Sequence, residues 1–265
     1  MDGHLEVAVD AARRAGALLL DRAGALREIR YKGSPTNLVT EMDRQAEALC
    51  VDHIRRAFPD HAILAEEGGA RPGSESHRWI IDPLDGTTNY AHGMPHFAVS
   101  IALEVEGRVA LGVIFDPSRD ECFTAVRGDG AFLNGRALRV SETPTLDESL
   151  LSTGYPYEIR RVHANNLAEH AAFMLRCRSV REMGSAAINL ALVAAGRLDA
   201  FWELALGPWD VAAGCLLVEE AGGRVTDPAG RPVSLAAPSV VASNGRIHDE
   251  MLRTLRQVRA QLPSA

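Results

Sequence analysis

The feature that most constrains this chain is the segment at residues 79–90, with the sequence WIIDPLDGTTNY. Its apolar beginning predicts a buried strand that delivers Asp82 to the strand end. Asp85 follows three residues later, so a single turn can aim both carboxylates into one site. Pro83 fixes the backbone between them and removes an N–H donor, and the Leu84 carbonyl is free to face the same ion. Because Mg²⁺ favours hard oxygen ligands in octahedral geometry, the segment predicts a magnesium site.

The next residues, Gly86, Thr87 and Thr88, predict a helical turn at the same point. Gly86 lets the backbone approach a ligand closely, and the exposed N–H groups of a helix start suit a phosphate oxygen. An isolated Asp-x-x-Asp-Gly pattern would indicate only a solvated turn, because these residue types are common in turns. In haloacid-dehalogenase-type phosphatases a single residue separates the two aspartates of the site, whereas Pro83 and Leu84 both stand between Asp82 and Asp85 here. Asp82 therefore suits the role of a metal ligand better than that of a nucleophile.

Two further carboxylates come from separate stretches of sequence. Glu66 ends a short apolar run, and a strand end there would bring it beside Asp82. Adjacent glutamates such as Glu66 and Glu67 are otherwise typical of an exposed surface. Asp210 occupies the expected N-cap position of a later helix, so it is a capping residue, a metal ligand or both. We therefore predict that three stretches of the chain supply one acidic site.

Three more candidates lie in the second half of the chain. Gly184 and Ser185 open another predicted helix, where Ser185 alone would indicate a simple N-cap. Glu203 ends an aromatic strand, so it either recognises a polar substrate or is an exposed charge.

Hydrophobic periodicity predicts an α/β protein in two halves. Residues 1–145 combine helices with an antiparallel meander sheet and carry most metal ligands, whereas residues 146–265 form an α/β half with Asp210 and the substrate contacts. Helices are expected at residues 5–20, 41–58, 165–176, 185–195, 211–221 and 247–262. Strands are expected at residues 61–65, 78–81, 97–105, 109–115, 122–126, 137–140, 150–153, 200–204, 223–226 and 239–242, with a loop at 69–77.

Composition limits the classes of function. The chain has 265 residues, 46% of them hydrophobic, which is enough for a full core. Its net charge is −7 and its Lys and Arg residues form no dense cluster, so direct nucleic-acid binding is not expected. Neither a membrane-spanning apolar run nor a signal-peptide layout is found, so we expect a cytoplasmic protein without membrane contact. The four cysteines are widely spaced, which predicts reduced thiols.

Six motifs carry a resemblance to a known family. They are LVTEMD at residues 38–43, AEEG at 65–68, WIIDPLDGTTN at 79–89, HFAVS at 96–100, GSAA at 184–187 and WDVAAG at 209–214. Together they resemble the inositol monophosphatase family, most closely its bacterial inositol-1-monophosphatase branch. The resemblance implies a phosphoric monoester hydrolase with an αβαβα sandwich fold, often homodimeric, that depends on two or three Mg²⁺ ions and is frequently inhibited by Li⁺.

The resemblance also implies roles for individual positions. The implied metal ligands are Glu66, Asp82, Asp85, Asp210 and the Leu84 carbonyl. The implied catalytic residues are Glu66, Thr87, which helps to orient the attacking water, and Asp43, its hydrogen-bonding partner. The implied substrate contacts are Gly86 and Thr87 at the phosphate, and Gly184, Ser185 and Glu203 near the inositol ring. Lys32 matches a basic residue that approaches the site in some relatives.

The implied reaction is in-line hydrolysis of a small phosphorylated polyol, with inositol 1-phosphate as the expected substrate. One Mg²⁺ held by Glu66 and assisted by Thr87 would activate water. A second, held by Asp82, Asp85 and Asp210, would stabilise the leaving alkoxide.

The chain departs from the family pattern at two places. Asn37 stands where many relatives carry an aspartate, and the loop after Glu67 is short, so we expect a weaker or more mobile third metal site.

Three alternative functions remain. The same chemistry on histidinol phosphate, fructose 1,6-bisphosphate or a 3′-phosphoadenosine nucleotide is one alternative. A regulatory protein that kept the fold and binds a protein partner, with residual phosphatase activity, is another. A purely structural metal module is the third, although it would not need Thr87 or Asp43.

Replacing Asp85 by Asn should abolish phosphate release and leave the fold intact. Loss of one buried ligand should lower the rate by roughly 10³ or more, because such charge stabilisation is worth several kcal/mol. Phosphate release in Mg²⁺ and circular dichroism of the variant check this, and near-wild-type turnover would refute it.

Overall fold

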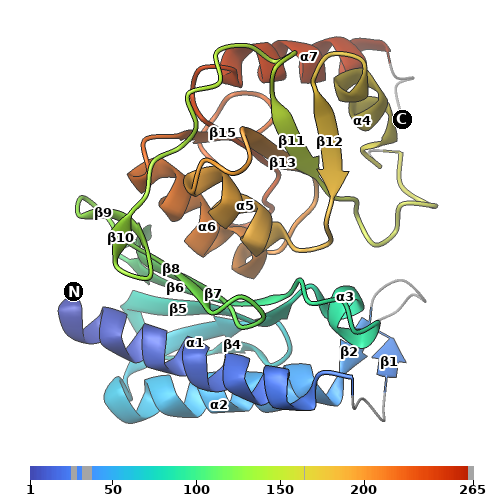
Figure 1. The fold of residues 1–265 in the computed structure, drawn as a ribbon. Helices are drawn as coiled ribbons and strands as arrows, with labels where there is room; N and C mark the ends of the chain where they lie inside the picture. The colour runs from blue at the N-terminus through green and yellow to red at the C-terminus, as the bar shows by residue number, and fades with distance from the viewer. Residues whose placement is uncertain (25–28, 32–37, 164, 262–265) are drawn as a thin grey trace.

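The structure is a computed structural model that describes residues 1–24, 29–31, 38–163 and 165–261. Its elements stack in five layers, with helices outside and between two sheets (Figure 1). The helices of the three α layers are α1 (Asp2–Arg22) with α2 (Glu41–Ala57), α5 (Ala186–Ala194) with α6 (Pro208–Glu220), and α4 (Leu167–Met174) with α7 (His248–Gln261). This arrangement confirms the predicted αβαβα sandwich.

The larger sheet is the predicted antiparallel meander, extended by one parallel pair. Its strand order is β10-β9-β8-β7-β6-β5-β3-β4, and only β3 and β5 are parallel neighbours. The strands are β3 (His61–Ala65), β4 (Gly69–Arg71), β5 (Ser74–Asp85), β6 (Ala98–Val105), β7 (Arg108–Asp116), β8 (Glu121–Val126), β9 (Gly130–Leu133) and β10 (Arg136–Ala137). Because β3 and β5 are parallel, their carboxyl ends meet at the same edge of the sheet.

Residues 69–77 form strands rather than the predicted loop. β4 pairs with β3, and β5 already begins at Ser74, so only Pro72 and Gly73 connect β4 to β5. A Cβ on Gly73 would collide with the backbone of Ala62, which makes the connection tight. β9 was not predicted, and the strand predicted at 137–140 shrinks to β10. Strands as short as β4, β9 and β10 have too few residues to show the apolar alternation that reveals longer strands.

The smaller sheet is mixed and has the strand order β12-β11-β13-β15-β14. Its strands are β11 (Leu150–Thr153), the unpredicted β12 (Ser179–Glu182), β13 (Ala200–Glu203), β14 (Arg224–Thr226) and β15 (Val240–Ser243). β11 is parallel to β12 and β13, whereas β15 is antiparallel to β13 and β14. A separate hairpin pairs β1 (Ile29–Tyr31) with β2 (Leu38–Thr40). The division at residue 145 stays a prediction.

The middle helical layer is held between the sheets by small residues. A Cβ on Gly214 of α6 would lie 2.5 Å from the Leu190 side chain of α5. A Cβ on Gly112 of β7 would lie 2.9 Å from the Cα of Ala213. α6 therefore lies directly on α5 and on the larger sheet, because larger side chains would separate these elements. This contact fixes the start of α6 at the junction of the two sheets.

Two of the compositional predictions can be compared with the structure. All four cysteines are free, as expected for reduced thiols. Among the residues that the structure describes, every helix falls short of the length or the apolar character that a membrane crossing requires.

Five aromatic rings stack where α1, the end of α2 and the larger sheet meet. Phe58 stacks on His4 and His61 with ring centroids 4.4 and 4.9 Å away, and His61 stacks on His77 at 4.6 Å. The Trp79 indole N–H donates to Nδ1 of His61 at 3.1 Å. Burial, followed by nearby positive charges that include His77, lowers the pKa of His4. Burial, followed by the charges of His77 and His4, lowers the pKa of His61, so neutral rings build the stack.

Acidification should therefore destabilise the stack of rings between α1, the end of α2 and the larger sheet. The folded-state pKa values of His4 and His61 lie below that of an unfolded histidine, about 6.5, so their contribution to stability is complete above that pH and is lost as the pH falls below it. His4→Phe keeps a flat ring against Phe58 and removes one titrating group. We expect its melting temperature to fall less than that of the wild type between about pH 7 and about pH 5. His163→Gln, at an exposed position, is the control, and equal slopes for wild type and His4→Phe would contradict this account.

Candidate active site

The parallel pairing of β3 and β5 brings two acidic stretches together. Ala65 pairs with Ile81, and the N–H of Glu66 donates to the Ile81 carbonyl at 3.2 Å. The next residue of β5 is Asp82. Glu66 directly follows β3, and it therefore lies beside Asp82 of β5 at the same edge of the sheet.

A β-bulge directs Asp82 and Asp85 into one site. Between these two residues β5 advances three positions while its partner β6 advances two. In a regular strand, residues three positions apart face opposite sides, and the extra residue of a bulge changes this. Pro83 has no N–H to leave unpaired at the bulge, and the Leu84 N–H donates to Oδ1 of Asp82 at 3.0 Å.

Asp210 reaches the site from α6, and it is not the N-cap that the sequence predicted. The N-cap is Gly207, because Pro208 fits the first helical position and starts the helix earlier. The Gly207 N–H donates to Oδ2 of Asp210 at 2.6 Å, so this carboxylate still caps the helix from its third position. Carboxylate oxygens of Asp82, Asp85 and Asp210, here called the carboxylate trio, lie within 4.8 Å of one another.

Burial raises the pKa of each carboxyl in the trio, and repulsion by neighbouring carboxylates raises it further for Asp82 and Asp210. For Asp82, burial has the largest effect, followed by the charges of Glu66, Asp85 and Asp210. For Asp210, burial comes first, followed by Asp85 and Glu66. Burial raises the pKa of Asp85 to about 6, against the hydrogen bonds that it accepts at the start of α5. Crowded carboxylates with raised pKa values favour a bound cation, and their hard oxygen donors fit a divalent ion such as Mg²⁺.

A hydrogen-bonded chain connects Asp43 to this region. The Thr40 N–H and hydroxyl donate to Oδ2 of Asp43 at 2.7 and 2.6 Å, at the start of α2. The hydroxyl of Thr87, the first residue of α3 (Thr87–Ala91), lies 3.1 Å from both Oδ1 of Asp43 and the Leu84 carbonyl. One hydroxyl proton serves one acceptor fully, so a cation on the Leu84 carbonyl would direct the Thr87 proton to Asp43.

Two helices begin beside the trio. Gly86, the N-cap of α3, has φ +93°, and a Cβ there would lie 2.9 Å from the His96 carbonyl oxygen. This position therefore requires glycine. Ser185 caps α5 and donates from its hydroxyl to Oδ2 of Asp85 at 2.5 Å, and the Ala187 N–H donates to the same oxygen at 2.7 Å. Asp85 thus lies at the positive end of α5.

The trio opens into a cleft of about 660 Å³, here called the carboxylate cleft. Its walls include Gly86, Thr87, Gly184, Ser185 and Glu203. Glu203 is buried, and burial, followed by the charges of Asp210, Asp85 and Glu182, raises its pKa. Among the described residues that line the cleft, none is Lys, Arg or His. The described lining of the cleft is therefore acidic.

Two groups in this cleft were missed by sequence reasoning. Tyr157 and Glu182 line it, the first from the loop between β11 and α4 and the second from the end of β12. The only local signals were the turn residues Gly154 and Pro156, which mark a loop without indicating where it lies. Lys32, together with Asn37, lies outside the described residues.

A histidine group also has the composition of a metal site. Ligand atoms of His4, His61 and His77 lie within 4.8 Å of one another. Their rings are stacked with interplanar angles of 9° to 24°. The lone pair of an imidazole nitrogen lies in the ring plane, so stacked rings do not direct their nitrogens at one ion. In addition, Nδ1 of His61 already accepts the Trp79 N–H. This geometry is that of a packing cluster.

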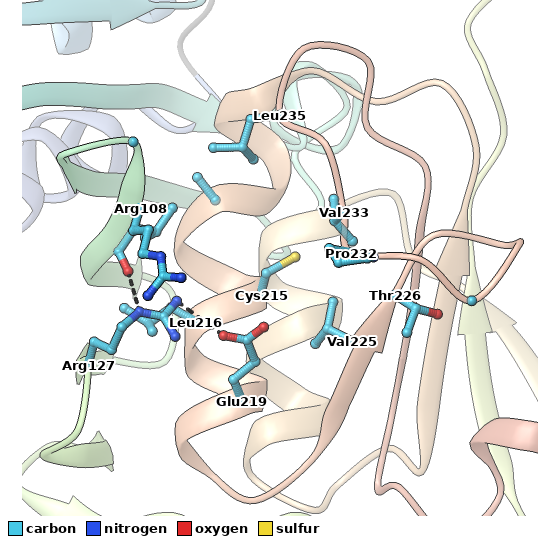
Figure 2. A pocket seen from close by; sticks show the side chains of 14 residues that line it. Arg108, Arg127, Cys215, Leu216, Glu219, Val225, Thr226, Pro232, Val233 and Leu235 are labelled. Atoms are coloured by element: carbon cyan, nitrogen blue, oxygen red, sulfur yellow. Dashed lines mark hydrogen bonds and ion pairs between the residues drawn. The ribbon is translucent and has the colours of Figure 1, made fainter. Parts of the chain in front are cut away.

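A second cavity, of about 600 Å³, follows the later turns of α6 (Figure 2). Arg127 pairs there with Glu219 at 3.1 Å and donates to the Val109 carbonyl at 2.8 Å. Burial raises the pKa of the Cys215 thiol, which disfavours the reactive thiolate. The described lining of this cavity offers neither clustered carboxylates nor an activated nucleophile, so the carboxylate cleft is the candidate active site.

Comparisons with known proteins identify the family of this chain. The model of the inositol monophosphatase family matches residues 1–260. The chain is 44% identical to Nus factor SuhB of Escherichia coli over 260 residues, 97% of each chain. It is 45% identical to an inositol-1-monophosphatase of Synechocystis sp. over 252 residues, 95% of this chain and 88% of the relative. A solved inositol monophosphatase from Anabaena (Nostoc) sp. superimposes with a TM-score of 0.88 at 44% identity, covering 97% of this chain and 96% of its own. The chain therefore belongs to the inositol monophosphatase family, and it is a phosphatase.

Proposed function

We propose that this phosphatase hydrolyses inositol 1-phosphate to inositol and phosphate with Mg²⁺ as its cofactor. The observation that carries the proposal is the carboxylate trio, whose oxygens lie within 4.8 Å of one another in a cleft that also contains Thr87. Relatives named inositol-1-monophosphatase support the choice of substrate.

The acidic residues would form the metal centre. Asp82, Asp85, Asp210 and the Leu84 carbonyl supply hard oxygen donors, and Glu66 adds a carboxylate from the neighbouring strand end. This donor set fits two or three ions. Bound Mg²⁺ supplies positive charge that lowers the pKa of water and offsets the charge of the phosphoryl oxygens.

Thr87 and Asp43 would orient the attacking water. Asp43 is 1% exposed, and Thr40 holds its other carboxylate oxygen, so its position is fixed. When the Thr87 hydroxyl donates to Asp43, its lone pairs point away and can accept a hydrogen bond from water. Glu66 would stand beside the same water and assist its deprotonation.

The walls of the cleft would hold the two ends of the substrate. Backbone N–H groups at Gly86 and Thr87 suit the phosphoryl oxygens. Gly184, Ser185 and Glu203 line the part of the cleft that would receive the polyol, where the Glu203 carboxyl can exchange hydrogen bonds with ring hydroxyls.

The charge of the cleft limits the substrate class. Glu182 and Glu203 would remain as acidic groups beside the leaving alcohol after cations bind the trio, and the described lining contains no Lys, Arg or His. A second phosphate on the substrate would meet these two carboxyls. A neutral polyol or a cationic alcohol suits the cleft better, so fructose 1,6-bisphosphate and 3′-phosphoadenosine nucleotides are disfavoured.

A second candidate role follows from the match to Nus factor SuhB, which covers 97% of this chain. A regulatory role with a protein partner would use surfaces outside the cleft, and residual phosphatase activity would accompany it. A homodimer, inhibition by Li⁺ and a cytoplasmic location are further predictions for this chain.

A panel of phosphate-release assays tests the substrate and the metal. With Mg²⁺, we expect kcat/KM for inositol 1-phosphate to exceed that for fructose 1,6-bisphosphate or a 3′-phosphoadenosine nucleotide by at least about tenfold, because like charges in contact cost several kcal/mol. EDTA should abolish release and Li⁺ should lower it. The Glu182→Gln substitution should reduce the difference in kcat/KM between inositol 1-phosphate and fructose 1,6-bisphosphate. Persistent activity in EDTA, or a bisphosphate as the best substrate, would overturn the proposal.

Removing one carboxylate should stabilise the metal-free protein. The folded-state pKa of Asp82 is raised, so its ionisation destabilises the fold increasingly as the pH rises above the unfolded value of about 3.9. Asp82→Asn keeps the shape of the side chain and can still accept from the Leu84 N–H. Near neutral pH in EDTA, we expect its melting temperature to rise, by about 2–4 °C for each kcal/mol relieved. The rise in melting temperature that Mg²⁺ gives to the wild type should be smaller in the variant. An equal rise in both proteins would argue against metal binding by Asp82.

A further inference from the structure

Asn89 connects two stretches of the chain that border the carboxylate cleft. It lies on α3, is 8% exposed and lines the cleft. Its side-chain amide donates to the His96 carbonyl at 2.9 Å and to the Met183 carbonyl at 2.7 Å. A side-chain amide has two N–H hydrogens, so each of these bonds uses one of them. Asn89 thereby ties α3 both to the turn before β6 and to the segment between β12 and α5.

Two glycines let these stretches approach closely around the amide. Gly184, the residue after Met183, has φ +75°, and a Cβ there would lie 3.0 Å from Nδ2 of Asn89. A Cβ on Gly86 would lie 2.9 Å from the His96 carbonyl oxygen and 3.3 Å from that of Gly184. A side chain at either glycine would therefore separate the segments that Asn89 joins.

The segment that Asn89 holds carries the donors to Asp85. Ser185 donates from its hydroxyl to Oδ2 of Asp85 at 2.5 Å, and the Ala187 N–H donates to the same oxygen at 2.7 Å. Asp85 ends β5, whereas both donors belong to the start of α5, so the distance between these elements decides whether the two bonds form. The bond from Asn89 to the Met183 carbonyl restrains this distance, because α3 follows β5 in the chain.

The two donors restrain a carboxylate that its neighbours repel. Asp85 belongs to the carboxylate trio, whose oxygens lie within 4.8 Å of one another. Repulsion between like charges at this separation favours rotation of the Asp85 side chain away from the other two. The hydrogen bonds to Oδ2 oppose that rotation and keep the carboxylate directed at its partners.

We propose that Asn89 is a positioning residue for the phosphatase reaction. By tying α3 to the segment before α5, it holds Ser185 and Ala187 at the distance where they orient Asp85 for metal binding. The inference rests on the proposed function, because it takes Asp85 as a ligand of Mg²⁺. Both N–H hydrogens of the amide are bonded within the protein, so Asn89 acts through Asp85 and not by donating to the substrate.

Asn89→Ala, which removes both donors and adds no charge, tests this role. We expect kcat for inositol 1-phosphate to fall by at least about tenfold, because small misplacements of a catalytic group cost that much or more. The Mg²⁺ concentration that gives half-maximal activity should rise, whereas KM should change little. Asn89→Ser, with one O–H donor for two carbonyls, gives the same comparison if the alanine variant is insoluble.

Asn244→Ala is the matched control. This buried amide also donates two hydrogen bonds, to the Ser141 hydroxyl at 3.1 Å and to the Thr143 carbonyl at 2.9 Å, and it lies outside the lining of the cleft. The substitution should lower the melting temperature and keep the wild-type dependence on Mg²⁺. A wild-type Mg²⁺ dependence in Asn89→Ala as well would overturn the proposal.

A double-mutant cycle tests whether Asn89 acts through the start of α5. Ser185→Ala removes the hydroxyl that donates to Asp85. If Asn89 places this hydroxyl, Asn89→Ala should lower kcat by a smaller factor in the Ser185→Ala background than in the wild type. Equal factors in the two backgrounds would mean that Asn89 acts elsewhere, and the inference would be wrong.

A measurement without catalysis separates this inference from the proposed function. Calorimetric titration of the metal-free proteins with MgCl₂ should show weaker binding for Asn89→Ala than for the wild type and Asn244→Ala. If the wild type bound Mg²⁺ but hydrolysed no inositol 1-phosphate, the proposed substrate would fail, and the titration would still decide the role of Asn89. Equal Mg²⁺ affinity in all three proteins would refute that role.

Discussion

The repulsion among three crowded carboxylates is the constraint on which the site depends. Asp82, Asp85 and Asp210 are brought within 4.8 Å of one another, and burial raises the pKa of each. The fold offsets part of this strain with neutral donors: the Leu84 N–H, the start of α5 and the Gly207 N–H each bind one member. These donors orient the carboxylates without neutralising them. The remaining negative charge is what makes the cluster suited to divalent cations.

This constraint explains why the site lies at a junction of layers. Two of the carboxylates come from one end of β5, whereas Asp210 comes from a helix held between the sheets by contacts at Gly112 and Gly214. The parallel pairing of β3 with β5 adds Glu66 at the same edge. Small residues beneath α6 thus serve the chemistry indirectly, because a helix displaced outward would carry Asp210 away from its partners.

The sequence predicted the features that local patterns encode. The spacing of Asp82 and Asp85 around Pro83 indicated a shared site, and apolar periodicity indicated the layers. The sequence pattern placed the start of α6 too late, because it assigned the N-cap to Asp210. A carboxylate at the third helical position and one at the N-cap both accept hydrogen bonds from backbone N–H groups at the helix start. Tyr157 could not be found in this way, because it lies in an aperiodic loop that tertiary contacts place. Asn166, for example, donates hydrogen bonds to the Thr153 hydroxyl and the Gly154 carbonyl at the base of this loop. The full length of β5 was hidden by the turn-forming residues at its beginning.

The three tryptophans are distributed so that each belongs to a different part of the molecule. Trp79 lies in the ring stack under α1, Trp202 packs against Phe173 near the outer helices of the other half, and Trp209 lines the carboxylate cleft. The fluorescence emission of an indole depends on local polarity and on neighbouring groups, and the Trp79 indole N–H is hydrogen-bonded to His61. Variants that retain one indole would therefore give separate optical signals for the first layer, for the second sheet and for the mouth of the site.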